Sequence, residues 1–163
     1  MKKYTDYKSN YDKYPVVKVS ETAEGICFCG WQEITDRLNN DLAAIDRAVK
    51  IVVVECYQGV LDEEVRTALQ KQLAHTLWID SASAMKPADE INAFLKDDIT
   101  DDEIFGYMTR HNIDCYFDEA KVAETRRAIE GVTAGTIVVY GTGAAYLSPR
   151  HDLLVYALSL IHI

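Results

Sequence analysis

The chain of 163 residues is 48% hydrophobic and 26% charged, a composition that predicts a folded domain and excludes a disordered polypeptide. This length is enough for one domain with a core of its own. The net charge of −9 opposes binding to nucleic acid or to anionic membranes, because both are recognised through lysine and arginine. A small phosphorylated ligand stays compatible with this charge, because a local pocket can oppose the overall sign.

No apolar run approaches the roughly eighteen residues of a membrane span, and no apolar stretch of a secretory signal follows the two lysines at the start. These two observations predict a cytoplasmic protein. The four cysteines agree with that compartment: Cys27 and Cys29 alternate on an extended segment, while Cys56 and Cys115 stand alone. Zinc sites need a second cysteine pair or histidines at a set distance, so we expect free thiols and no metal site.

Strand and helix patterns alternate along the chain, which predicts an α/β fold with a mostly parallel, layered sheet and flanking helices. Short β-branched or apolar runs predict strands at residues 16–19, 51–54, 76–79, 136–140 and 153–156. Apolar residues at helical spacing predict helices at residues 30–48, 62–73, 88–96 and 117–130. Residues 16–157 form a single α/β domain in this interpretation. Residues 1–15 are rich in tyrosine and lysine, and we expect an extended arm that orders against a partner.

A capping box is predicted in the middle of the chain, with Thr100 as the helix cap and Glu103 three residues later. The helix that it begins would pack Ile104, Phe105 and Met108 inward. The carboxylates at residues 97, 98 and 101–103 are also a candidate cation site, but they lack the spaced ligands and internal glycine of a calcium loop. Helix capping and solvation explain this cluster better.

The loop after residues 51–54 lies where a nucleotide-binding phosphate loop would lie, between a buried strand and a helix. Such a loop reads Gly-x₄-Gly-Lys-[Ser/Thr]; its amides and lysine bind phosphates, and its hydroxyl holds magnesium. Here one glycine, Gly59, remains, and the lysine and hydroxyl are missing. Glu55 and Asp62 add negative charge where phosphate would sit. The pattern is therefore a degenerate Walker A motif and favours an inert turn over a phosphoryl-transfer site.

A second glycine-containing loop, residues 141–143, follows the predicted strand 136–140. It is similar to the start of a dinucleotide fingerprint, but Tyr146 stands in place of the third glycine, so a tight loop is favoured. Open α/β sheets nevertheless bind ligands at this edge, and the polar residues after the loop are therefore candidates. The four histidines are scattered, and no catalytic residue is predicted. The candidate ligand-binding residues of the two loops are Tyr57, Gln58, Gly59, Gly141, Thr142, Gly143, Ser148 and Arg150.

Several segments in order resemble the N-terminal extension of long class I mannose-6-phosphate isomerases of gut-type bacteria. The longest reads Val54-Glu55-Cys56-Tyr57-Gln58-Gly59-Val60-Leu61-Asp62-Glu63-Glu64-Val65, and the others are residues 11–15, 99–106, 139–145 and 152–157. The resemblance covers most of residues 11–157. It implies a degenerate, uridine-kinase-like P-loop domain that precedes the catalytic cupin.

In that family, zinc bound by the cupin assists the interconversion of mannose 6-phosphate and fructose 6-phosphate. The cupin's Gln-x-His-Pro ligand motif does not occur here; the nearest sequence, Gln72-Leu73-Ala74-His75, has the wrong spacing and lies on a predicted helix. No catalytic or metal residue carries over, and no cofactor is expected in this chain. The sequence departs from the family after Ala157, so we interpret residues 158–163 as an atypical tail left by truncation.

Three functions stay open from the sequence. The leading hypothesis is a non-catalytic accessory domain of a mannose-6-phosphate isomerase, inactive by itself and partnered by its own C-terminal cupin. The second is a stand-alone module that binds a nucleotide or a phosphosugar through the two loops. The third is a structural interaction domain that docks through its tyrosine-rich arm. A homo-oligomer is compatible with each hypothesis.

Overall fold

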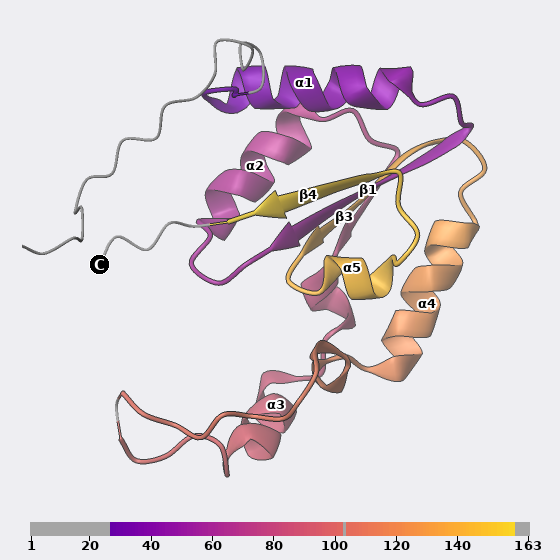
Figure 1. The fold of residues 1–163 in the computed structure, drawn as a ribbon. Helices are drawn as coiled ribbons and strands as arrows, with labels where there is room; N and C mark the ends of the chain where they lie inside the picture. Colours follow the sequence, from indigo (N-terminus) through magenta and orange to yellow (C-terminus); the bar gives the residue numbers. More distant parts are fainter. Residues whose placement is uncertain (1–26, 103, 159–163) are drawn as a thin grey trace, which may run out of the picture.

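The computed structural model describes residues 27–102 and 104–158. Within them, four strands form one sheet in the order β2-β3-β1-β4, and every neighbouring pair is parallel (Figure 1). The predicted α/β class and parallel sheet with flanking helices are thus confirmed. The elements in chain order are α1 (Trp31–Ala44), β1 (Val49–Cys56), α2 (Asp62–Gln72), β2 (Leu77–Asp80), the 3-10 helix η3 (Ser81–Ala84), α3 (Ala88–Leu95), the 3-10 helix η4 (Ile113–Tyr116), α4 (Glu119–Glu130), β3 (Gly135–Gly141), α5 (Ala144–Leu147) and β4 (Leu153–Ala157).

The two central strands, β1 and β3, hold the core of the sheet. Residues 52–54 of β1 and 137–139 of β3 have no exposed surface. Successive strand residues point to opposite faces, so a run of buried β-branched residues requires a cover on both sides. Helices α1 and α2 cover one face, and η3, α4 and α5 cover the other (Figure 1). The β-branched runs therefore predicted the central strands because these strands are buried on both faces.

The start of the chain and its end lie partly outside the described residues. The predicted arm at 1–15, the predicted strand at 16–19 and residues 159–163 of the predicted tail all fall there. Helix α1 ends at Ala44, not at residue 48 as predicted, because Ile45 is extended and the chain turns into β1 at Val49. None of the helices in the described residues is long and apolar enough to cross a membrane.

Residues 86–116 leave the sheet and return to it at one place, and we call them the acidic excursion (Figure 1). Its base is closed by an antiparallel bridge between Met85 and Phe117 and by a hydrogen bond of 3.0 Å from the Lys86 amide to the Tyr116 carbonyl. Helix α3 and the 3-10 helix η4 lie within it, and neither contains a buried residue. The acidic excursion is therefore an appendage to the core and not a layer of it.

The predicted helix at Thr100 does not form. The Thr100 hydroxyl instead accepts a hydrogen bond from the Asp102 amide at 3.2 Å, and the Asp102 carboxylate accepts from the amides of residues 104 and 105 at 2.8 and 2.9 Å. The prediction that Ile104, Phe105 and Met108 pack inward is wrong, since they are 81%, 71% and 95% exposed. An excursion that lies away from the sheet offers these side chains no apolar layer to cover them. Glu103, the other residue of the predicted capping box, lies outside the described residues.

Candidate functional site

The carboxyl edge of the sheet is the candidate site because the strand order reverses there. The chain leaves β1 toward α2 on one face, whereas it leaves the adjacent β3 toward α5 on the other face. Ligands of open α/β sheets bind at such a switch point, outside the carboxyl ends of the strands. The predicted loops 57–59 and 141–143 follow β1 and β3, so the structure brings these two groups of candidate residues to one edge.

The loop after β3 surrounds a carboxylate of the protein itself. The amide of Gly143 donates a hydrogen bond of 2.6 Å to Glu55 Oε1, and the amide of Ala145 donates one of 2.8 Å to Glu55 Oε2. Gly143 has a φ of 76°, and a Cβ atom there would lie 2.7 Å from the ring of Phe117, so glycine is required. Amides at the start of a helix commonly bind anions. Here Glu55, from the end of β1, is the anion that they bind.

Hydroxyl groups connect the ends of three strands. The Thr142 hydroxyl donates to the carbonyl of Cys56 at 2.9 Å, and the Ser81 hydroxyl donates to the carbonyl of Thr142 at 2.8 Å. Ser81 has almost no exposed surface, and a Cβ atom on Gly141 would lie 2.4 Å from its oxygen. Thr142, a predicted ligand-binding residue, therefore uses its side-chain hydroxyl to join β3 to β1.

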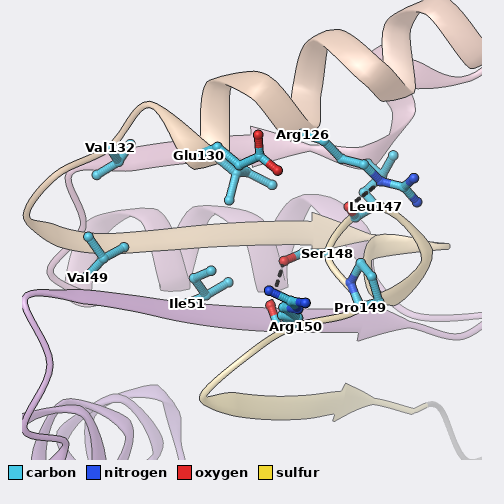
Figure 2. A pocket seen from close by; sticks show the side chains of 10 residues that line it. Val49, Ile51, Arg126, Glu130, Val132, Leu147, Ser148, Pro149 and Arg150 are labelled. Atoms are coloured by element: carbon cyan, nitrogen blue, oxygen red, sulfur yellow. Dashed lines mark hydrogen bonds between the residues drawn. The ribbon is translucent and has the colours of Figure 1, made fainter.

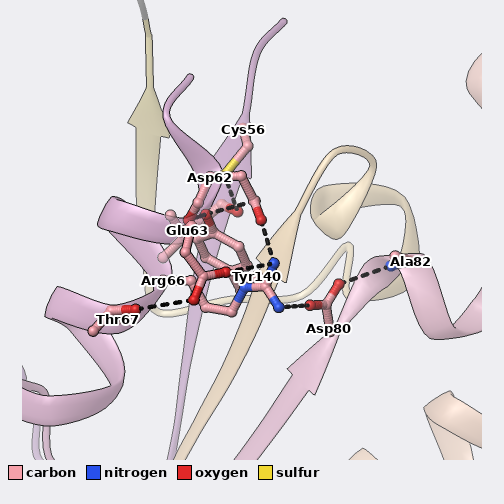
Figure 3. A network of polar contacts seen from close by, with 9 residues as sticks. Cys56, Asp62, Glu63, Arg66, Thr67, Asp80, Ala82 and Tyr140 are labelled. Atoms are coloured by element: carbon pink, nitrogen blue, oxygen red, sulfur yellow. Dashed lines mark hydrogen bonds and ion pairs between the residues drawn. The ribbon is translucent and has the colours of Figure 1, made fainter. Parts of the chain in front are cut away.

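An ionic network lies beside these bonds, at the start of α2 (Figure 3). Arg66 contacts the carboxylate of Asp62 at a short distance, that of Asp80 at 3.6 Å and that of Glu63 at 3.8 Å. The hydroxyl of Tyr140, which is fully buried, donates to Asp62 Oδ1 at 2.8 Å. Asp80 also accepts a hydrogen bond of 3.0 Å from the Ala82 amide. The guanidinium of Arg66 thus forms ion pairs with three carboxylates.

The environment of the network shifts the pKa values of several of its members. Arg66 lowers the pKa of Asp62, first through its hydrogen bond. Burial is the first cause that raises the pKa of Tyr140 well above its ordinary value, and the bonds to Cys56 and Asp62 add to it. Burial also raises the pKa of the Cys56 thiol. Cys56 and Tyr140 are therefore neutral at physiological pH, and a thiolate nucleophile is not favoured at this edge.

The loop at residues 57–61 has the position of a phosphate loop but directs its groups elsewhere. The Tyr57 amide donates to the carbonyl of Ala157 at 3.0 Å, and the Val60 amide donates to the carbonyl of Tyr57 at 3.3 Å. Tyr57, Gln58 and Gly59 are exposed. The first turn of α2 contains only acidic charge, at residues 62–64, and the nearby Arg66 is engaged by carboxylates. The charge of this arrangement opposes a polyphosphate, and two amides of the loop bind carbonyls of the protein itself.

Two predicted residues, Ser148 and Arg150, lie at a separate place. They line a cavity of about 520 Å³ over the start of β1, together with Val49, Ile51 and residues of α4 (Figure 2). The buried Ser148 hydroxyl donates to the carbonyl of Arg150 at 2.9 Å. In the same wall, Arg126 donates to the carbonyls of Tyr146 and Leu147 at 2.8 and 3.3 Å. The structure thus separates these two residues from the other six candidates and uses the Ser148 hydroxyl to hold a turn.

The sequence interpretation missed the residues that hold the carboxyl edge together. From the sequence, Glu55 is only a charge that repels phosphate, and Asp80, Arg66 and Tyr140 have no predicted role in a site. One signal was available, because polar residues directly after buried parallel strands meet at one edge, and Asp80 follows the predicted strand 76–79. The hydrogen bond from the Gly143 amide to Glu55 joins two residues that are 88 positions apart in the sequence. No pattern in a single sequence predicts such a contact. Within the described ranges, no three histidine, cysteine or acidic residues come together to hold a metal ion.

These features define an open, parallel α/β domain whose switch point is filled by its own side chains. No curated protein and no solved structure matches the chain. One protein family does, described as a domain of unknown function (DUF8485), and the match covers residues 30–158. The chain belongs to this family.

Proposed function

We propose that this chain is a non-catalytic accessory domain with a degenerate P-loop-like fold. The observation that carries the proposal is the Glu55 carboxylate, which binds the amides of Gly143 and Ala145 at 2.6 and 2.8 Å. A domain that processes phosphorylated substrates needs free amides and free cations at its switch point. Here a carboxylate binds the amides, and carboxylates surround Arg66.

The P-loop-like part of the proposal rests on position. The loop at residues 57–61 connects an inner parallel strand directly to a helix, as a phosphate loop does. It lacks the lysine and the hydroxyl that would bind phosphate and magnesium. A P-loop scaffold that has lost phosphate and magnesium binding accounts for both the position of this loop and its composition.

The parent enzyme that the sequence resemblance suggests is a mannose-6-phosphate isomerase, in which this domain would precede a zinc-containing cupin. In that arrangement the accessory domain would contribute folding, oligomerisation or ligand sensing, and the cupin would perform the isomerisation. The chain would then be a fragment of a cytoplasmic enzyme that has no isomerase activity of its own. Reading the genomic DNA downstream of the codon for Ala157 tests the parentage: we expect an open frame into a cupin with Gln-x-His-Pro, and the absence of such a frame would contradict it.

Binding and activity measurements on the purified chain test the proposal that it neither binds phosphorylated ligands nor catalyses isomerisation. Calorimetric titrations with ATP, UTP and mannose 6-phosphate are expected to show no saturable binding at millimolar ligand, and the chain should not interconvert mannose 6-phosphate and fructose 6-phosphate. Saturable binding of any of the three would instead favour the stand-alone nucleotide- or phosphosugar-binding module. Isomerase activity of the purified chain would contradict the accessory role directly.

A second candidate is a structural interaction domain, which the exposed apolar side chains favour. Tyr57, Leu61, Tyr156 and Leu158 are each more than 60% exposed beside the carboxyl edge. Leu61, Tyr156 and Leu158 line a groove of about 510 Å³ between α1, α2 and β4. Apolar surface that gathers in this way is typical of a contact with another protein. Size-exclusion chromatography with light scattering tests self-association; a monomer at all concentrations would limit this candidate to contacts with other proteins.

A further inference from the structure

The acidic excursion combines exposed apolar side chains with an excess of negative charge. Residues 86–116 contain three basic and eight acidic residues, so they contribute −5 to the net charge of −9. Among the described residues of this segment none is buried. The large hydrophobic side chains that it exposes are Ile99, Ile104, Phe105, Tyr107, Met108 and Ile113. This surface is the largest concentration of exposed apolar side chains in the described residues.

Hydrogen bonds hold the backbone of the tip of the excursion, in which Ile104, Phe105 and Tyr107 lie. The Asp102 carboxylate accepts from the amides of residues 104 and 105, and the Tyr107 amide donates to the carbonyl of Asp98 at 2.9 Å. A Cβ atom on Gly106 would lie 2.8 Å from that carbonyl oxygen, so the two segments of the tip are in close contact. The tip therefore has a defined backbone held by polar contacts, while its apolar side chains face solvent.

Among the described residues, three exposed carboxylates of the excursion form no side-chain hydrogen bond or ion pair, and two of them, Asp97 and Asp101, lie close in sequence to its exposed apolar side chains. Asp97 and Asp101 are exposed and, within the described residues, form no hydrogen bond or ion pair through their side chains. Asp98, in contrast, lies 3.4 Å from His111, and Asp102 caps two amides. Asp97 and Asp101 thus provide negative charge beside an apolar surface, and the complementary ligand is a segment with basic and apolar residues.

We propose that residues 1–19 of the same chain dock on the acidic excursion. These residues contain five lysines and two aspartates, together with four tyrosines and three valines, so they are basic and rich in apolar surface. Lysine would pair with Asp97 and Asp101, and tyrosine and valine would cover Ile104, Phe105 and Met108. A second copy of the excursion is excluded as the occupant, because two segments of charge −5 repel each other.

The start of α1 and the base of the acidic excursion lie at the same edge of the sheet, which bears on docking within one chain. The Trp31 indole donates to Glu64 at 3.0 Å, which places the start of α1 beside the start of α2 at the carboxyl edge. The acidic excursion leaves the sheet at the same edge, because η3 directly follows β2, but from the opposite face, so the segment would have to pass around this edge. The linker at 20–26 can extend by roughly 3.5 Å per residue. A tethered segment of this kind is present at an effective concentration of about a millimolar, so weak contacts suffice.

The oxidation rate of Met108 in the full chain, followed by mass spectrometry, tests the proposal, because docking would cover a side chain that is otherwise 95% exposed. Asp97→Lys with Asp101→Lys should raise this rate roughly threefold, and 1 M NaCl should do the same by screening. Adding Lys8→Glu and Lys13→Glu to that variant should restore the slow rate. The matched control, Glu124→Lys with Glu130→Lys on α4, makes the same change in net charge and should leave the rate unchanged.

Three outcomes would overturn the proposal. The first is a Met108 oxidation rate that is equal in the wild type and in the Asp97→Lys, Asp101→Lys variant. The second is a failure of the reversed charges at residues 8 and 13 to restore protection. The third is protection that disappears on dilution, which would show that the segment comes from another molecule. Equal urea midpoints for the variants establish that they are folded, as expected for changes at exposed positions.

Discussion

The carboxyl edge of the sheet and the acidic excursion both carry an excess of carboxylates, but they use them in opposite ways. At the edge, Glu55, Asp62 and Asp80 all bind groups of the same domain, namely backbone amides, Arg66 and the Tyr140 hydroxyl. In the excursion, Asp97 and Asp101 face solvent without a partner among the described residues. The acidic composition of a segment therefore does not reveal whether its charges stabilise the fold or are available to another molecule.

The difference follows from burial. A carboxylate next to a buried strand end must find donors, because an unpaired charge with restricted access to water is costly. A carboxylate on an exposed loop is solvated and has no such requirement. The edge residues are thus expected to contribute to stability and the excursion residues to contribute to binding. Substitutions matched between the two regions can test this division.

The largest effect is expected from a pair of identical substitutions, Ile137→Ala and Ile104→Ala. Ile137 has no exposed surface and lies at the centre of the sheet, whereas Ile104 is 81% exposed. Removing a buried isoleucine typically costs about 2–5 kcal/mol, whereas a change at an exposed site usually stays within about 0.5 kcal/mol. Urea unfolding measures both values. Similar losses for the two variants would show that the excursion is part of the cooperative core.

The sequence was sufficient to predict the centre of the fold because the central strands are buried on both faces. Residues 51–54 and 136–140 are continuous β-branched or apolar runs, and both lie inside the observed strands β1 and β3. The strand order could not be obtained in this way. The placement of β3 between β1 and β2 depends on which helices cover which face, and no local pattern encodes that choice.

The excursion shows the opposite case, in which a local pattern was misleading. Thr100 and Glu103 have the spacing of a capping box, and Ile104, Phe105 and Met108 suggest an apolar helix face. Such a pattern predicts a helix only where another layer covers the apolar face, because packing supplies most helical stability. The same limit applies to the site: six candidate residues lie together at the carboxyl edge, but the contact of Glu55 with Gly143 is a tertiary one that no local pattern predicts.

The next largest effect is expected for Glu55→Gln. The change removes the charge from an acceptor of two backbone amides and turns one of its oxygens into a donor, so one amide loses its partner. Loss of a charge-assisted hydrogen bond in a partly buried site costs about 1–3 kcal/mol in the free energy of unfolding. Glu124→Gln on the exposed side of α4 is the matched control and should be neutral. A neutral Glu55→Gln would mean that Glu55 does not hold the loop after β3.

A smaller loss is expected for Tyr140→Phe, which deletes only the hydroxyl that donates to Asp62 at 2.8 Å. The ring stays in place between Trp78 and the rest of the core, at a centroid distance of 5.4 Å from the indole. The expected cost is about 1 kcal/mol, the usual net value of one hydrogen bond. Tyr156→Phe, at an exposed tyrosine of β4, provides the comparison by chemical denaturation. A loss at Tyr156 as large as that at Tyr140 would contradict the importance of the network.

The smallest effect is expected from the titration of Asp62, and its sign is fixed by the direction of the shift. Arg66 lowers the pKa of Asp62 in the folded state below its value in the unfolded chain, which is about 3.9. The stabilisation is therefore present above the unfolded pKa and is lost as the pH falls through the folded pKa. We expect Asp62→Asn to be less stable than the wild type at pH 6, and the gap to narrow toward pH 3.

This gap should stay below about 1 kcal/mol, because the Asp62 side chain is 51% exposed and solvent screens its pair with Arg66. Repeating the comparison in an Arg66→Gln background removes the first cause of the pKa shift, so the narrowing with pH should become weaker. A gap that is constant from pH 6 to pH 3 would mean that Asp62 titrates alike in both states. In that case neither the ion pair with Arg66 nor the bond from Tyr140, which also lowers the pKa of Asp62, would favour the charged form of Asp62 in the folded state.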